Sequence, residues 1–186
     1  MISTFKFAPL YRAVALCAAS LALASGAHAA GDKTAYEQAK SSAKTTYESE
    51  RKQCDPMTGN AKDVCVLQAK ANRTRTEDTA EAAYKNTDRA RQSAAKEIAE
   101  ADYKVAKEKC DDLSGNPKSV CVKEAKAALT KAKADARATK EIRTARKDAA
   151  EDKRDADYQV AKQKCDALAG DAKSACMEQA KATYGK

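Results

Sequence analysis

Three copies of one cysteine pattern constrain the fold of this chain more than any other feature of its sequence. In each copy two cysteines are separated by ten residues, and successive copies are offset by 56 and 55 residues. Each copy also has a Tyr seven residues before its first Cys, an Asp directly after it and a Gly five residues after it. A repeat of this period indicates that one supersecondary unit is used three times. The pairs are Cys54 and Cys65, Cys110 and Cys121, and Cys165 and Cys176.

Each cysteine pair encloses a predicted turn between two helices. Between residues 32 and 184, Gly occurs only at 59, 115 and 170 and Pro only at 56 and 117, and all five lie inside the pairs. The Gly residues suit the left-handed conformation that ends a helix, and the Asn or Asp that follows suits the start of the next helix. An ion pair between the Asp that ends one helix and the Lys that starts the next is expected across each turn. The chain is therefore expected to form helix–turn–helix corners at 54–65, 110–121 and 165–176.

A disulfide is expected across each corner. Its two cysteines lie at matching heights on the two helices, because one precedes the Gly by five residues and the other follows it by six. The closed loop is short, and the chain-entropy model gives each bridge just under ~3 kcal/mol. This local pairing needs no long-range closure. A zinc site is disfavoured because each corner offers two Cys and no His, and a redox pair is more often spaced C-x-x-C.

The segments between the corners are predicted to be long helices. From 65 to 110 and from 121 to 165 the chain is rich in Ala, Lys, Glu and Arg, which are strong helix formers. A narrow apolar stripe, made mainly of Ala, follows each segment at three- and four-residue steps, as in a coiled-coil seam. We therefore expect an all-α fold. Its long antiparallel helices would form a coiled-coil-like hairpin or bundle, joined by the disulfide-linked corners.

Two shorter helices, at about 33–55 and 172–184, would complete this arrangement. Corners one and three would then lie at one end of the long pair, and corner two at the other end. If the long helices instead break near 85–90 and 140, a compact bundle replaces the rod. The Ala seam is also a surface through which copies of the chain could self-associate.

The composition of residues 30–186 argues against an enzyme. This part contains 12 Leu, Ile and Val residues in total against 34 Ala, and it has no His, Phe or Trp. Such a chain buries little apolar surface per turn, unlike the core of a conventional globular enzyme. Its sequence shows no nucleophile–base pair, phosphate-binding loop or metal-ligand cluster. We therefore expect a protein that is not an enzyme, with no catalytic, cofactor-binding or metal-binding residues.

The first 29 residues have the order of a secretory signal peptide. Two basic residues precede an apolar run at 13–24, and Ala27-His28-Ala29 provides a small-residue cleavage site. We therefore expect a signal peptide at 1–29 that is cleaved after Ala29, leaving a helical domain at 30–186 with no transmembrane span. An uncleaved anchor is the alternative, although the run is short for a membrane span. Export to the periplasm, an oxidising compartment, agrees with the paired cysteines.

The repeated motif Y-x6-C-D-x-[LM]-x-G-[ND]-x-K-x-[VA]-C resembles uncharacterised exported Ala/Lys-rich proteins of Gram-negative bacteria, some of which are labelled TolA-like cell-envelope proteins. The resemblance covers most of 30–186. The TolA family implies an inner-membrane anchor, a long Ala/Lys-rich helical rod and a C-terminal globular domain that contacts envelope partners. Only the rod composition matches here, and we expect no terminal domain because the chain ends ten residues after Cys176. The resemblance therefore implies the cell envelope as the compartment.

The excess of positive charge is concentrated in one segment. Residues 30–186 carry 33 basic and 27 acidic side chains, and 131–147 alone hold seven basic and two acidic ones. Such a stripe suits anionic lipid, lipopolysaccharide or an acidic protein. We therefore expect a periplasmic structural or interaction protein that binds an anionic envelope component or a protein client and needs no cofactor. The candidate surface consists of Lys133, Arg137, Lys140, Arg143 and Lys147.

Two alternative functions also suit a Lys/Ala-rich helical chain. Nucleic-acid binding agrees with the charge, but the signal peptide, the paired cysteines and the lack of aromatic side chains among the basic ones disfavour it. A stress-protective protein of the late-embryogenesis type would be largely unordered in dilute buffer and would fold on drying. Steep salt dependence of DNA binding would support the first alternative, and cooperative loss of helix in water would exclude the second.

Overall fold

A computed structural model describes residues 31–186, and the chain is helical over most of that range. The predicted signal peptide at 1–29 and its cleavage site at Ala29 lie outside the described residues. The predicted all-α class is confirmed, since residues 31–186 contain no strand. The helices are α1 (Lys33–Gln53), α2 (Gly59–Lys85), α3 (Asp88–Lys109), α4 (Gly115–Cys165) and α5 (Gly170–Tyr184), and a 3₁₀ turn at Cys110–Asp112 follows α3.

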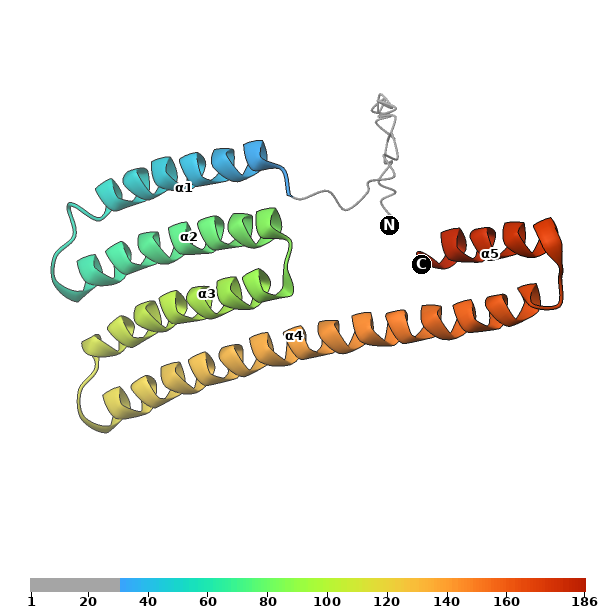
Figure 1. The fold of residues 1–186 in the computed structure, drawn as a ribbon. Coiled ribbons are helices and arrows are strands. Elements are labelled where there is room, and N and C mark those ends of the chain that lie inside the picture. The colour runs from blue at the N-terminus through green and yellow to red at the C-terminus, as the bar shows by residue number, and fades with distance from the viewer. Residues whose placement is uncertain (1–30) are drawn as a thin grey trace, which may run out of the picture.

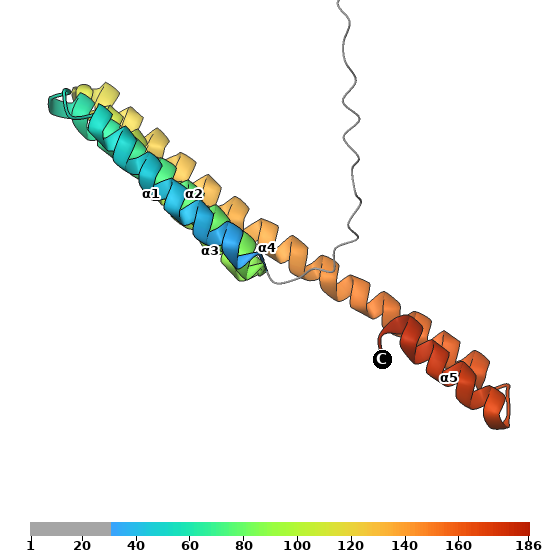
Figure 2. The same ribbon diagram turned by 90° about the horizontal axis from the view of Figure 1, so that it is seen from above.

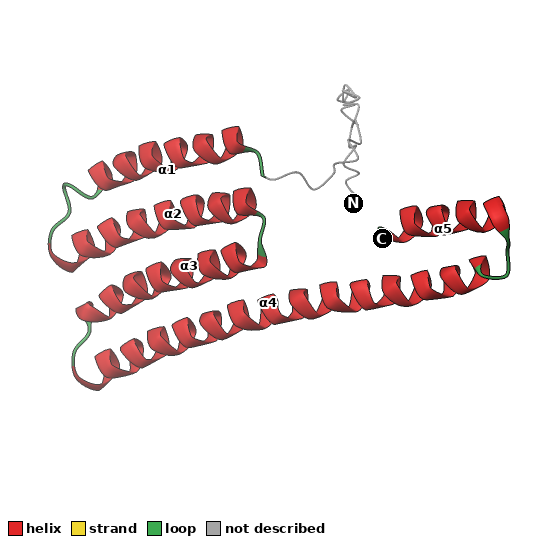
Figure 3. Ribbon diagram, viewed as in Figure 1, coloured by secondary structure: helices red, strands yellow, loops and turns green. Residues whose placement is uncertain are grey.

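Helices α1 to α4 lie side by side and antiparallel in one layer (Figure 1). Extensive contacts join only helices that follow each other in the chain, namely α1 with α2, α2 with α3, α3 with α4, and α4 with α5. Seen from above, α1, α2, α3 and the first part of α4 overlap in a narrow stack, and the second part of α4 extends beyond it (Figure 2). Since α4 has 51 residues, it is about 75 Å long. α5 folds back along the projecting end, on the side of α4 where α3 also lies (Figure 3).

A turn at Asn86 and Thr87 divides the predicted helix at 65–110 into α2 and α3. Asn86 has a left-handed backbone with a φ of 47°, a conformation that Asn adopts more readily than most residues. The side-chain oxygen of Thr87 accepts a hydrogen bond from the Ala90 amide at 3.1 Å, which caps α3. The break considered near 85–90 is therefore present, whereas α4 continues through 140 without one.

This turn corrects the expected placement of the corners. Because α3 folds back along α2, corners one and two lie at the same end of the layer, and corner three lies at the far end of α4 (Figure 1). The expected hairpin of two long helices is therefore replaced by a four-helix layer from which one helix projects.

All three corners contain the expected disulfide. The paired Cα atoms are 5.7, 5.7 and 5.6 Å apart in chain order, and the first cysteine of each pair is buried. Gly59, Gly115 and Gly170 have φ values of 58°, 59° and 56°, the left-handed conformation expected of them. Their position differs from the prediction, because each begins the second helix of its corner instead of ending the first. No side-chain hydrogen bond caps these second helices, so the expected Asn or Asp cap is absent there.

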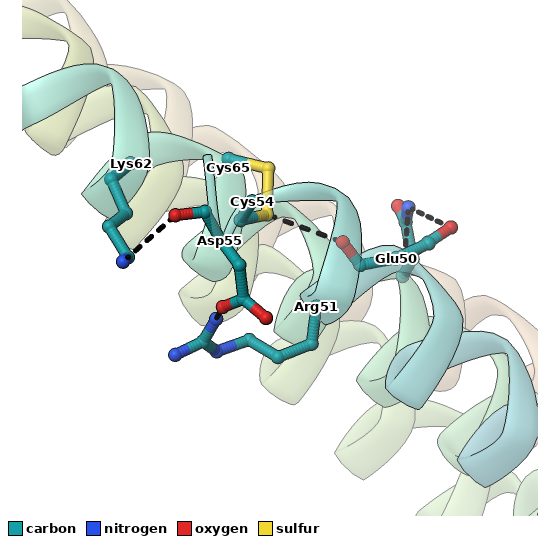
Figure 4. The surroundings of a disulfide bond; sticks show 7 residues. Glu50, Arg51, Cys54, Asp55, Lys62 and Cys65 are labelled. Atoms are coloured by element: carbon teal, nitrogen blue, oxygen red, sulfur yellow. Dashed lines mark hydrogen bonds and ion pairs between the residues drawn. A yellow bond between two sulfur atoms is a disulfide. The ribbon is translucent and has the colours of Figure 1, made fainter. Parts of the chain in front are cut away.

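The expected ion pair across the corner forms in two of the three copies. In corner one, the carboxylate of Asp55 accepts a hydrogen bond from Arg51 at 2.7 Å instead, and the Lys62 ammonium reaches the backbone oxygen of Asp55 at 3.5 Å (Figure 4). These contacts are exposed, so each is worth little stability in water. The two pairs that form are Lys118 with Asp111 and Lys173 with Asp166, each at 2.9 Å.

The buried side chains of residues 31–186 are small. Apart from three cysteines and Val105, all of them are alanines, so each removes little apolar surface from water. Only part of the predicted Ala seam is buried where α1 to α4 adjoin, and its continuation along α4 is open to solvent. Ile142 and Val160 are 53% and 55% exposed. The buried alanines are Ala43, Ala69, Ala71, Ala82, Ala94, Ala99, Ala125, Ala136 and Ala180.

Candidate anion-binding surface

The five basic residues predicted to form a surface on α4 fall into two groups. Lys147 and Arg143 converge on one carboxylate of α3, that of Asp88, which Arg143 approaches at 3.9 Å. Lys133 forms an ion pair with Glu100 of α3 at 2.5 Å. The remaining two, Arg137 and Lys140, form no ion pair among residues 31–186. Three of the five predicted residues therefore join α4 to α3.

Asp88 anchors the start of α3 to the middle of α4. It lies in the first turn of its helix, where a negative charge is stabilised by the helix dipole. Its side chain is 11% exposed and also receives Arg91 at 3.3 Å. A hydrogen bond from Lys147, and then one from Arg91, hold the pKa of Asp88 below its ordinary value of 3.8. Three cations thus meet one carboxylate at the point where α4 leaves the layer.

The pKa shifts of these two carboxylates predict how stability depends on pH. Lys133, through a hydrogen bond and its charge, likewise lowers the pKa of Glu100 from its ordinary value of 4.5. Because each folded pKa lies below the unfolded one, the two carboxylates contribute stability above the unfolded values and lose it as pH falls through the folded values. The double variant D88N/E100Q is therefore expected to have a lower Tm than the wild type near neutral pH and the same Tm once both carboxylates are protonated.

Thermal unfolding followed by circular dichroism across the acid range measures this difference. The matched control is D63N, which removes one exposed carboxylate that forms no ion pair among residues 31–186. A gap between D88N/E100Q and the wild type that stays constant down to the lowest pH would contradict the assignment.

Two rows of basic side chains adjoin across the α3–α4 pair. Within each helix successive members of a row are three, four, seven or eight residues apart, which places them on one side of the helix. The ion pair between Lys133 and Glu100 shows that the two rows meet. Lys104 also contributes, more weakly than Lys133, to lowering the pKa of Glu100. We define the basic face as Lys96, Lys104 and Lys107 on α3 with Lys126, Lys133, Arg137 and Lys140 on α4.

The basic face carries an almost uncompensated charge. Of its seven cations, only Lys133 has a carboxylate within 4 Å in the part of the chain that the structure describes. Lys104, Lys107, Lys126 and Arg137 are exposed, and the other three are half-buried. Because long basic side chains keep their ammonium or guanidinium groups in water, this face presents several charges to one partner.

Sequence reasoning missed the contribution of α3 to this surface. The segment that it singled out begins at residue 131 and lies wholly on α4, so Lys126 and the three lysines of α3 were not included. The sequence does contain a signal for these lysines. A disulfide at corner two makes residues that lie at similar distances before Cys110 and after Cys121 face each other. Lys107 and Lys126 are such a pair. The two rows meet only because the disulfide of corner two sets the register of α3 against α4.

No group of three or more Cys, Asp or Glu side chains in residues 31–186 is placed to hold a metal ion. None of the helices from α1 to α5 is both long enough and apolar enough to cross a membrane. No protein-family model, curated protein or solved structure matches the chain.

Proposed function

We propose that this protein is a periplasmic structural protein that binds an anionic component of the cell envelope through its basic face. The observation that carries the proposal is the set of seven basic side chains on one side of two antiparallel helices, of which only Lys133 has a carboxylate within 4 Å among residues 31–186. Phosphate groups of lipids are the anions that such a surface fits best in the envelope. Each Lys or Arg near an anionic lipid surface contributes about 1 kcal/mol, and this attraction weakens with salt.

The fold supports this proposal by holding the basic side chains of α3 and α4 beside each other. α3 and α4 are tied by the disulfide at corner two and by the ion pairs of Asp88 with α4. The cations therefore remain together although they repel each other. Export through the signal peptide at 1–29 is part of the same proposal, and the three disulfides support it because they persist in an oxidising compartment. Mass determination of the periplasmic protein should give a chain that begins at Ala30.

The basic face predicts binding to vesicles that contain phosphatidylglycerol and weak binding to vesicles of phosphatidylcholine. The variant K104Q/K107Q/K126Q removes three exposed cations of the face. It is expected to lower the affinity for the anionic vesicles at least about tenfold at low salt, since about 3 kcal/mol of attraction is at stake. Co-sedimentation with vesicles measures the affinity.

The matched control is K33Q/K44Q/K52Q, which removes three exposed lysines of α1 and the same total charge. It should retain most of the affinity. Equal losses in the two triple variants would show that net charge, and not the basic face, governs binding. Failure of the wild type to bind anionic vesicles, combined with capture of an acidic periplasmic protein that K104Q/K107Q/K126Q abolishes, would assign the face to a protein client instead of a lipid.

A further inference from the structure

The large apolar side chains exposed in residues 31–186 fall into two groups. One group occupies the same position in each corner, three residues after the first Cys, and consists of Met57, Leu113 and Leu168. The other group lies on α4 and consists of Val120, Ile142 and Val160. These three are 22 and 18 residues apart, close to whole numbers of helical turns, so they share one face of α4. We define the outer face of α4 as Ala127, Ala138, Ile142, Ala149, Ala156 and Val160, all of which are exposed.

The outer face is equivalent in the repeat to an interface that is buried elsewhere in the same chain. With the repeat offset of 56 residues, Ala71 and Ala82 of α2 correspond to Ala127 and Ala138 of α4. Both residues of α2 are buried, and they line grooves between α2 and α3. The first half of the outer face therefore has the character of the α2 surface that packs on α3.

The second half of the outer face corresponds in the same way to α3. With the offset of 55 residues, Ala94 and Val105 of α3 correspond to Ala149 and Val160 of α4. Val105 is 6% exposed in α3, whereas Val160 is 55% exposed in α4. α4 thus carries both partners of the α2–α3 interface, one after the other along a single helix.

The missing turn explains why these surfaces stay open. Both repeat offsets place Ile142 at the position of the turn formed by Asn86 and Thr87. Ile142 continues α4, so the second half of the helix cannot fold back on the first. α3 and α5 both lie along the other side of α4, and nothing in residues 31–186 covers the outer face (Figure 1).

We propose that the outer face of α4 binds the outer face of α4 in a second copy of the chain, with the two helices antiparallel. The two-fold axis passes close to Ile142, so the first half of each α4 meets the second half of the other. Each half-interface then repeats the α2–α3 packing, and the contact is the same on both copies, as a two-fold dimer requires. The paired stretch is symmetric about this axis and runs from about residue 123 to the end of α4 at Cys165, a length of about 60 Å.

Charge complementarity supports a second copy as the occupant. Arg75 of α2 binds Asp102 of α3 at 2.7 Å, and the equivalent residues of α4 are Lys131 and Asp157. Both are exposed and form no ion pair within residues 31–186. In the proposed dimer Lys131 of each copy lies opposite Asp157 of the other, which reproduces the ion pair twice.

The α2–α3 interface also contains a group of carboxylates that repel each other, and this group is not repeated on α4. Asp78, Glu81 and Glu97 line one groove of that interface, and burial together with their repulsion raises the pKa of Asp78. The equivalent residues on α4 are Ala134, Arg137 and Asp152. Three carboxylates thus become one Ala, one Arg and one Asp, so the repulsion between three like charges is absent from the dimer contact.

Measurement of the molar mass of the oxidised protein by light scattering over a range of concentrations tests the proposal. The wild type is expected to reach the mass of two chains. I142E/V160E places unpaired carboxylates in the contact and should weaken association at least about tenfold. M57E changes an equally apolar, exposed residue at corner one and should leave association unchanged. A wild type that stays monomeric throughout, or a dimer that I142E/V160E does not weaken, would overturn the proposal.

Charge exchange between the copies tests the antiparallel arrangement itself. K131E and D157K each place like charges in both symmetry-related pairs, so each variant alone should associate more weakly than the wild type. Mixing the two variants restores opposite charges in both pairs and should recover a mixed dimer. Association of the mixture no stronger than that of either variant alone would exclude the proposed contact, even if a dimer of another kind forms.

Discussion

Removing all three disulfides is expected to lower the free energy of unfolding by about 8 kcal/mol, because each bridge closes a short loop worth nearly 3 kcal/mol. The total stability of a domain is of the order of 5–15 kcal/mol. In this chain the buried side chains are almost all alanines, and no helix of the layer is covered on more than two sides. The reduced protein should therefore lose most of its helix at about 37 °C. Far-ultraviolet circular dichroism before and after reduction and alkylation measures the loss.

The control is alkylation without reduction, which should leave the spectrum unchanged because all cysteines of residues 31–186 are bonded. The variant C165S/C176S should give a local effect. α5 has 15 residues, and Ala180 is its one buried side chain, so without its bridge it is too short to remain a stable helix. Hydrogen exchange should then increase in α5 and remain slow in α1 to α3. Retention of full helix after complete reduction would contradict the structural role of the bridges.

The variant N86A/T87A is expected to lower the free energy of unfolding by about 2 kcal/mol. Ala in the left-handed conformation of Asn86 costs about 1 kcal/mol, and loss of the Thr87 hydrogen bond to the start of α3 costs about as much. Ala at both positions also favours one continuous helix over the turn, as happens at the equivalent position of α4. Urea unfolding followed by circular dichroism measures the change.

T79A provides the control, because Thr79 is exposed within α2 and caps no helix. Its effect on stability should be within a few tenths of a kcal/mol of zero, since Ala is the better helix former. A loss in N86A/T87A no larger than that in T79A would show that neither residue fixes the turn.

The corners and the turn differ in how far the sequence could predict them. Each corner is marked by a Gly, and two of the corners also by a Pro, and between residues 32 and 184 these two residue types occur nowhere else. The turn at Asn86 has neither. It depends on the tolerance of Asn for the left-handed conformation and on a capping Thr, and both residue types also occur inside helices. For this reason the sequence alone leaves open whether the long helices are continuous or break near 85–90 and 140. The structure has the first break, whereas α4 is continuous through 140.

The basic face could be predicted only in part, for a related reason. Helical spacing identified Lys133, Arg137 and Lys140 from one segment, since residues on one helix keep their relation wherever the helix lies. The same spacing grouped Arg143 and Lys147 with them, although these two lie next to Asp88. Which charges meet across two helices depends on the register of α3 against α4, and the disulfide of corner two fixes that register.

Every residue of α4 from 148 to 154 is exposed, and this lone stretch of helix has a mechanical consequence. The four-helix layer and the α4–α5 hairpin each hold together through their own disulfides, so each resists deformation as a unit. In a single copy of the chain, bending between them is opposed only by the hydrogen bonds of one helix. A load applied between corner three and the opposite end of the molecule would therefore flex this stretch first, as an elastic joint between two stiff bodies.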